Sequence, residues 1–218
     1  SFPTRRSSDL DYEDLHRAML VVYKDIEDDP WKRRDVARLL KIFPEGQIAV
    51  EVNGQVVGCA LSLIVDYSNF GDKHTYDEIT AKETFRTHDP EGDVLYGIEV
   101  FVHPDYRGMR LARRLYDVRK ELVERFNLRA IIAGGRIPGY CGYAEELTPR
   151  QYIQKVRQKE VYDPILSFQL SNGFHVKKVL RSYLSGDTES LEYATLLEWN
   201  NIYYEEKPNA LYRKKREV

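Results

Sequence analysis

One segment of the chain, residues 94–122, has the residue types and spacing of a phosphate-binding turn. A predicted strand ends at Pro104, and a basic turn at residues 107–110 (Arg-Gly-Met-Arg) opens a predicted helix. The first N–H groups of a helix have no partners within it and carry partial positive charge, so they bind anions. Gly108 lets the main chain approach such a ligand closely. We predict an anion cradle, mainly of backbone amides, that consists of Arg107, Gly108, Met109, Arg110, Leu111, Ala112 and Arg113.

Two elements must hold this turn in place, and both show the expected periodicity. Apolar residues alternate along one side of the predicted strand, and they are Val94, Tyr96, Ile98, Val100 and Val102. The same alternation puts on the opposite side Gly97, Glu99, Phe101 and His103. The apolar stripe of the helix is Leu111, Leu115, Val118 and Leu122, with spacings of four, three and four.

The remaining elements predict an α/β (α+β) fold. We expect helices over residues 10–25, 31–43, 148–160 and 164–171, with a short helix near 76–82. We expect further strands over residues 47–52, 55–65, 127–133, 175–184 and 192–199. Asn53-Gly54 joins two of them and is a strong hairpin signal. This order predicts a mixed, mostly antiparallel twisted sheet flanked by helices.

Composition and charge argue against several classes of function. The 33 basic and 35 acidic residues give a net charge of −2, so no large basic field favours nucleic acid. No apolar run approaches the roughly 20 residues of a membrane helix. Two cysteines far apart in sequence fit a reducing cytoplasm, and the five histidines lack the spacing of metal ligands. We therefore expect a cytoplasmic protein with no metal, nucleic-acid or membrane partner.

The basic turn resembles the signature of the GNAT N-acetyltransferase superfamily, (Gln/Arg)-x-x-Gly-x-(Gly/Ala) after a strand that ends in Val-x-Pro. Residues 102–104 (Val-His-Pro) match the end of the strand. Arg107 and Ala112 match the first and last signature positions, whereas Arg110 stands where the pattern has Gly.

Longer blocks resemble one bacterial branch of this family, in which the module is fused upstream of a carbon–nitrogen (nitrilase-like) hydrolase. The blocks are RGMRLARRLY, GGRIPGY at 134–140, the segment 163–174 and ATLLEWNN at 194–201. The resemblance covers roughly residues 12–204.

The resemblance implies the fold expected above, with acetyl-CoA as the acyl donor and its pyrophosphate in the cradle. In this family the strand before the turn separates from its neighbour, and the cofactor lies in the gap. Backbone groups of Val100, Phe101 and Val102 are then expected to bind the pantetheine arm. An N–H at this point also stabilises the oxyanion formed from the thioester carbonyl. The implied activity is direct acetyl transfer to a small-molecule or peptide amine.

Glu99 is the candidate general base. Burial of a carboxylate in a sheet is costly unless it is paired or has a role. Removal of a proton from the incoming ammonium, directly or through water, is such a role. A salt bridge at an edge of the sheet is the alternative, and Tyr96 and His103 are weaker candidates for the base.

The general acid is missing from its usual position. Many family members carry a Tyr four residues before the Gly-Phe that follows the last helix, where it protonates the leaving thiolate. Here Gly-Phe is present at 173–174, but the position holds Gln169, whose amide donates a hydrogen bond without giving up a proton. Either the thiolate leaves unassisted or another Tyr acts. Among Tyr140, Tyr143 and Tyr162 we predict Tyr140.

Both ends of the chain are interpreted as incomplete. Residues 1–10 lack periodicity and look like a non-native leader, so the strand that normally precedes the first helix is expected to be missing. Residues 11–204 are the predicted domain, and residues 205–218 are interpreted as a linker toward the hydrolase. The alternative function is a non-catalytic acyl-CoA-binding module that regulates the fused amidase. Gln169 and Arg110 leave this alternative open.

Overall fold

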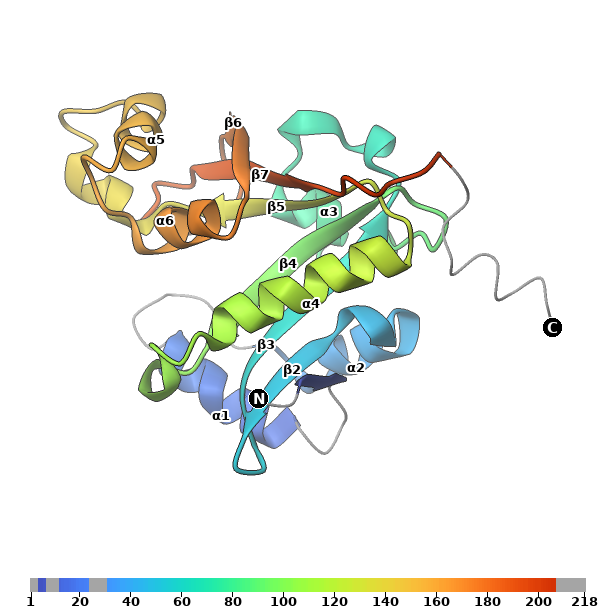
Figure 1. Ribbon diagram of the computed structural model, residues 1–218. Helices are drawn as coiled ribbons and strands as arrows, with labels where there is room; N and C mark the ends of the chain where they lie inside the picture. The colour runs from blue at the N-terminus through green and yellow to red at the C-terminus, as the bar shows by residue number, and fades with distance from the viewer. Residues whose placement is uncertain (1–3, 7–11, 24–30, 207–218) are drawn as a thin grey trace.

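The structure is a computed structural model, and it describes residues 4–6, 12–23 and 31–206. Its centre is a seven-stranded sheet in the order β1-β2-β3-β4-β5-β7-β6 (Figure 1). The strands are β1 Thr4–Arg6, β2 Ile48–Val52, β3 Gln55–Val65, β4 Val94–Val102, β5 Ala130–Arg136, β6 His175–Leu180 and β7 Ala194–Asn200. All neighbouring strands are antiparallel except β4 and β5, which are parallel. The predicted mixed, mostly antiparallel α/β fold is confirmed.

Helices cover both faces of this sheet, and a hydrophobic core lies on each side. They are α1 Tyr12–Val22, α2 Arg33–Ile42, α3 Tyr76–Thr80, α4 Leu111–Arg125, α5 Pro149–Arg157 and α6 Pro164–Ser171. One core joins α1, α2 and α3 to the sheet through residues such as Leu15 and Leu39. The other joins α4, α5 and α6 to the opposite face through residues such as Leu115 and Leu166. Figure 1 shows α4 crossing in front of the middle of the sheet.

Local sequence signals set the ends of several elements as predicted. Asn53 (φ +53°) and Gly54 (φ +81°) both adopt the left-handed conformation of a two-residue hairpin turn between β2 and β3. Thr148 starts α5 with a capping box that it forms with Gln151. The Asp163 side chain caps α6. The hairpin and the starts of α5 and α6 are therefore confirmed.

The sheet opens between β4 and β5. Their parallel pairing runs from the start of each strand only as far as Gly97 with Ala133. Beyond this pair β4 continues along β3 to Val102, whereas β5 continues along β7 to Arg136. Two strands that are paired at one end are thus separated at the other, as the resemblance implied.

An irregularity in β4 changes the direction of its last side chains. Leu61 of β3 pairs with Glu99, but the next residue, Ser62, pairs with Gly97, so Ile98 is an extra residue in β4. One inserted residue moves every later side chain to the other face of a sheet.

The membership of the two hydrophobic cores shows that the side chains of β4 change faces at the bulge. Val94, Tyr96, Ile98 and Phe101 belong to the core on the α1 side. Val102, with Val100 packed at its edge, belongs to the core on the α4 side. The predicted single apolar side from Val94 to Val102 is therefore wrong beyond the bulge, because strict alternation assumes an uninterrupted strand.

Three further expectations are corrected. The strand before the first helix was expected to be missing, but β1 pairs with β2 ahead of α1. Lack of periodicity did not exclude this strand, because pairing at a sheet edge uses main-chain groups. The strand expected over 127–133 starts at Ala130 instead, because α4 runs to Arg125 and Asn127 (φ +52°) turns the chain after it. In α4, Arg119 is buried, whereas Val118 is only half-buried.

The described residues offer neither a membrane-spanning helix nor a metal site. No helix in that part of the chain is long and apolar enough to cross a membrane. Nor do those residues contain a group of three or more His, Cys, Asp or Glu that could hold a metal ion.

Candidate active site

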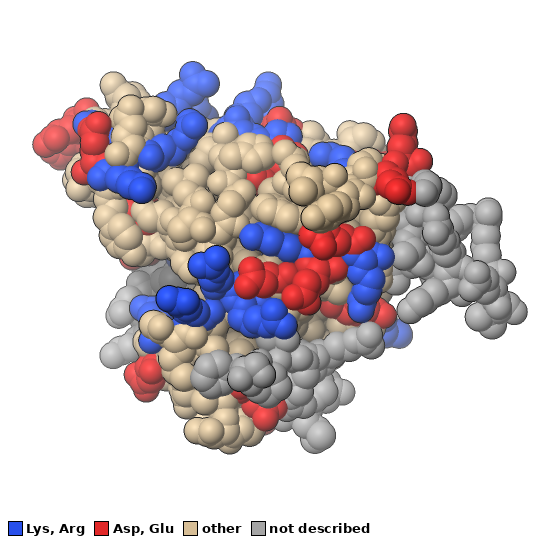
Figure 2. Space-filling model, in the orientation of Figure 1, with Lys and Arg blue, Asp and Glu red and all other residues tan. Residues whose placement is uncertain are grey.

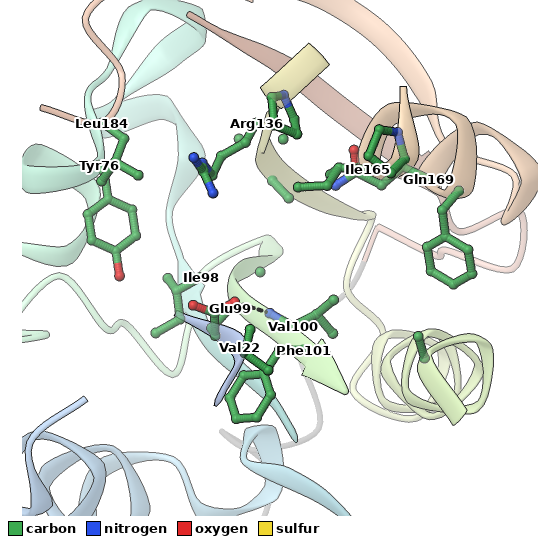
Figure 3. A pocket seen from close by; sticks show the side chains of 18 of the residues that line it. Val22, Tyr76, Ile98, Glu99, Val100, Phe101, Arg136, Ile165, Gln169 and Leu184 are labelled. Atoms are coloured by element: carbon green, nitrogen blue, oxygen red, sulfur yellow. Dashed lines mark hydrogen bonds between the residues drawn. The ribbon is translucent and has the colours of Figure 1, made fainter. Parts of the chain in front are cut away.

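A large cavity lies at the opening between β4 and β5 (Figure 3). Its volume is about 1280 Å³, above the roughly 300–1,000 Å³ of a typical small-molecule site, so it has room for two reactants together. Residues of β4, β5, α4, α6 and the segment 182–185 line it. Figure 3 shows Tyr76, Glu99 and Arg136 directed toward one space from different elements, with Gln169 on the α6 side.

The turn before α4 offers unpaired backbone donors in the wall of this cavity. Within the described part of the chain, no hydrogen bond uses a backbone N–H of residues 108–113, and no side chain caps α4. Arg107, Gly108, Arg110 and Ala112 line the cavity. Figure 2 shows basic side chains gathered at the N-terminal end of α4. The start of a helix with free N–H groups and nearby arginines suits an anion.

The other three predicted cradle residues do not line the cavity with their side chains. Met109 and Arg113 are exposed, and Leu111 is buried in the core beneath α4. Leu111 therefore has only its main chain to offer to a ligand. That backbone amides dominate the cradle stays a prediction.

Arg110 has a backbone conformation that favours glycine. Its φ of +61° and ψ of +19° lie in the left-handed region at the N-cap of α4. This conformation costs a residue with a side chain about 1–2 kcal/mol. The left-handed conformation thus explains why the signature has glycine at this position. Arg110 adopts the same conformation although its side chain makes it strained.

Glu99 lies in the cavity wall and is held by three donors. Its Oε2 accepts hydrogen bonds from Tyr23 Oη (2.5 Å) and Trp31 Nε1 (3.4 Å), and its Oε1 accepts one from the Val100 N–H (2.8 Å). Burial and the charge of Glu99 raise the pKa of Tyr23, so the hydroxyl remains a donor. Within the described ranges no Lys, Arg or His forms an ion pair with Glu99. The alternative of a structural salt bridge gains no support.

The residues expected to bind a pantetheine arm also line the cavity. Val100, Phe101 and Val102 belong to the part of β4 that has no β5 partner. The Val100 N–H is occupied by the Glu99 carboxylate. A ligand carbonyl that reached this N–H would take the place of the carboxylate oxygen.

Arg119 is a residue of the cavity that the sequence reading missed. Its side chain is 2% exposed. It donates hydrogen bonds to Ser62 Oγ (3.1 Å), to the Leu61 carbonyl oxygen (2.6 Å) and to the Glu99 carbonyl oxygen. Burial lowers the pKa of the guanidinium, but arginine remains charged in proteins. The available signal was its spacing, four residues after Leu115 on the buried side of the helix.

Tyr140, predicted as the general acid, does not belong to the cavity wall. Its hydroxyl donates to the Leu147 carbonyl oxygen (3.0 Å), and its ring packs against Tyr152 and Tyr193. The 3₁₀ turn Pro138–Tyr143 places it in that buried aromatic cluster. The structure thus separates Tyr140 from Glu99 and the cradle, and we withdraw it as the acid.

Gln169 lines the cavity from α6, where family members carry the acidic Tyr. It is 7% exposed, and its Oε1 has no hydrogen-bond partner in the described structure. Tyr116 of α4 lies beside it and also lines the cavity. Burial raises the pKa of Tyr116 despite the opposing effects of Arg119 and Gln169. Tyr116 therefore keeps its proton at neutral pH.

An ion-pair network closes another part of the cavity wall. Arg136, at the end of β5, donates from Nε to Asp187 (2.8 Å) and from a terminal nitrogen to Glu189 (3.0 Å). Burial alone raises the pKa of the Asp187 carboxyl, but hydrogen bonds from Arg136 and Ser190 outweigh it and lower the pKa. The guanidinium of Arg136 therefore binds carboxylates of the protein itself, Asp187 and Glu189.

Comparison with known proteins agrees with this geometry. The Acetyltransferase (GNAT) family matches residues 12–138. Probable hydrolase YhcX of Bacillus subtilis (strain 168) is 48% identical over 176 residues, which are 81% of this chain and 34% of YhcX. Uncharacterized N-acetyltransferase YkwB of the same organism is 35% identical over 174 residues, which are 80% of this chain and 76% of YkwB. The chain thus spans about a third of the length of YhcX and three quarters of that of YkwB.

Solved structures share the fold at low identity. The loading GNATL domain of CurA from Lyngbya majuscula has a TM-score of 0.78 at 20% identity, over 92% of this chain and 98% of that one. A GphF GNAT-like decarboxylase in complex with isobutyryl-CoA has a TM-score of 0.76 at 18% identity, over 91% and 98% of the two chains. From the match over residues 12–138 and the identity to YkwB, the chain belongs to the GNAT family of acetyltransferases.

Proposed function

We propose that this chain is an acetyl-CoA-dependent N-acetyltransferase that transfers the acetyl group directly to an amine. The observation that carries the proposal is the cavity between the separated ends of β4 and β5. Free helix N-terminal amides and a carboxylate both lie in its wall. One relative is called an N-acetyltransferase, and one structure of the same fold holds an acyl-CoA.

The donor is proposed to lie along β4. Its pyrophosphate accepts hydrogen bonds from the backbone amides of residues 108–113, with Arg107 and Arg110 adding positive charge. Its pantetheine arm then runs past Val100, Phe101 and Val102, in place of the strand pairing that β5 no longer provides. No metal takes part in this arrangement.

The transfer forms a C–N bond and breaks a C–S bond. Glu99 takes a proton from the acceptor ammonium, directly or through water, and the neutral nitrogen attacks the thioester carbonyl carbon. The carbonyl oxygen gains negative charge and accepts a hydrogen bond from the Val100 N–H. For this, the Glu99 carboxylate must turn away from the N–H that it occupies in the free protein. The carbonyl then re-forms as the C–S bond breaks, CoA leaves as a thiolate, and the new amide nitrogen gives its remaining extra proton to water.

Tyr116 replaces Tyr140 as our candidate partner of the leaving thiolate. It is a protonated hydroxyl in the cavity wall, beside the Gln169 that stands at the usual position of the acid. The Gln169 amide can only donate a hydrogen bond. The two side chains together offer the thiolate a proton and a second donor.

The setting of the module is also part of the proposal. Because the chain matches about a third of YhcX, called a probable hydrolase, we place it upstream of a carbon–nitrogen hydrolase domain. Residues 205–218 would then be the linker toward that domain. The acceptor is a small-molecule or peptide amine, and the compartment is the cytoplasm.

The test is release of free CoA thiol from acetyl-CoA by the purified protein in mixtures of amines. The proposal expects protection by CoA against thermal unfolding and thiol release that depends on one class of amine. Binding without turnover on any amine would instead support the non-catalytic regulatory module. Absence of CoA protection would contradict both.

A further inference from the structure

Arg119 carries a buried charge that no acidic side chain of the described structure contacts directly, although the Glu99 carboxylate acts on it from a longer distance. The residue is 2% exposed, and the acceptors of its hydrogen bonds are the neutral Ser62 hydroxyl and two backbone carbonyls. No ion pair with Arg119 occurs among the described residues. A buried charge that no acidic group contacts directly is costly, and this indicates a role other than stability.

The two carbonyls that Arg119 binds lie at the bulge in β4. Leu61 of β3 and Glu99 of β4 are paired residues, and the register shift begins directly beside them. Gly97 leaves space for the guanidinium, because a Cβ there would lie 3.0 Å from a terminal nitrogen of Arg119. Arg119 thus fixes, from α4, the point at which β4 changes direction.

The Glu99 carbonyl belongs to the same peptide group as the Val100 N–H. A cation that binds the oxygen of a planar peptide draws electron density from its nitrogen and makes the N–H a stronger donor. That N–H points to an anionic oxygen in the free protein, the Glu99 carboxylate, at 2.8 Å. In the free protein the carboxylate oxygen thus occupies the position proposed for the thioester oxyanion.

We propose that Arg119 is a positioning residue for acyl transfer, which orients and polarises the Glu99–Val100 peptide so that its N–H stabilises the thioester oxyanion. This inference rests on the proposed function. Arg119 itself does not touch the substrate; it acts through the peptide group.

The experiment compares Arg119→Met and Arg119→Lys with the parent in acetyl-CoA affinity, kcat and KM. It adds the infrared carbonyl stretch of bound acetyl-CoA labelled with ¹³C at the acetyl carbonyl. Lys120→Met is the matched control. Lys120 is the next residue of α4, and its ammonium donates a hydrogen bond to the Asn172 carbonyl oxygen (2.7 Å). Neither residue lines the cavity. A purely structural role for Arg119 would not shift the carbonyl stretch.

Arg119→Met should lower kcat about 10- to 100-fold, below the loss of a whole oxyanion donor, with acetyl-CoA affinity changed less than about threefold. The carbonyl stretch should move toward that of the free thioester, and Arg119→Lys should restore part of both effects. Should Arg119→Met fail to fold, Gly97→Ala displaces the guanidinium instead and should shift the stretch in the same direction.

An unshifted stretch in the variants, or a loss of kcat no greater than in Lys120→Met, would overturn the role of Arg119. In that result the parent would still bind acetyl-CoA and turn over, so the proposed function would stand. A parent protein that does not bind acetyl-CoA would instead overturn the proposed function and this inference together.

Discussion

Replacement of Arg110 by Gly separates what the main chain of the cradle contributes from what the side chain contributes. Arg110 has φ of +61° at the N-cap of α4. Arg110→Gly removes the left-handed strain and the guanidinium together, whereas Arg110→Ala removes only the guanidinium. The difference in stability between the two variants therefore reports the strain less the conformational freedom that glycine adds to the unfolded chain.

The expected magnitude follows from this conformation. The left-handed conformation destabilises a residue with a side chain by about 1–2 kcal/mol. Glycine avoids this cost but loses about 0.5–1 kcal/mol of stability, because it has greater freedom in the unfolded chain. Arg110→Gly should therefore be more stable than the parent by about 0.5–1 kcal/mol. For a chain of this size that raises Tm by about 1–4 °C. Arg110→Ala should gain nothing.

The assays are thermal unfolding and calorimetric titration with CoA. If backbone amides dominate the cradle, both variants should lose only about threefold to tenfold in CoA affinity, the value of one exposed charge contact. Lys159→Gly is the matched control, because Lys159 is exposed, also has φ of +61° and lies outside the cavity wall. It should raise Tm by a similar amount and leave CoA affinity unchanged.

Two results would refute this reasoning. An Arg110→Gly variant that is less stable than Arg110→Ala by about 0.5–1 kcal/mol would show that the left-handed conformation carries no strain. A loss of CoA affinity beyond about 100-fold in both variants would show that the guanidinium, rather than the main chain, holds the phosphates.

Other changes test the remaining parts of the site. Arg107→Glu places a carboxylate in the cradle and should weaken CoA binding by at least about tenfold in titration, and an unchanged Kd would exclude the cradle. Glu99→Gln should lower kcat/KM about 10²- to 10⁴-fold, and a kcat/KM like that of the parent would exclude Glu99 as the base. Asp187→Asn should cost about 2 kcal/mol, less than a fully buried pair because the Arg136 side chain is 19% exposed, and should lower Tm by about 4–8 °C. Because the pKa of Asp187 is lowered, its contribution is present above the ordinary carboxyl pKa and is lost as pH falls through the lowered value. The Tm difference between parent and Asp187→Asn should therefore shrink in acid, and a difference that is independent of pH would contradict the assigned cause.

The elements set by local chemistry could be predicted from the sequence. The Asn53-Gly54 turn, the Thr148 capping box and the Asp163 cap act within a few residues, so their patterns are legible in the chain. The turn proposed to bind phosphate is of the same kind, since a strand end, a glycine and a helix start are all local. Four of its predicted residues line the cavity, including Arg107 and Ala112.

The features set by tertiary packing could not be predicted in this way. The extra residue Ile98 is visible only when β3 is paired with β4, and it decides which side of the sheet Phe101 faces. The spacing of Arg119 after Leu115 indicates the buried side of α4 but not its acceptors, because the two carbonyls lie 58 and 20 residues away in sequence. Tyr140 looked available because the partners of its ring, Tyr152 and Tyr193, are distant in the chain. Periodicity carries no information on such contacts.

The most direct measurement is a crystal structure of the protein with bound acetyl-CoA. The account predicts pyrophosphate oxygens about 3 Å from backbone nitrogens of residues 108–113, and the thioester oxygen on the Val100 N–H with the Glu99 carboxylate turned away. Acetyl-CoA bound elsewhere, or a thioester oxygen remote from Val100 while Glu99 keeps that N–H, would contradict it.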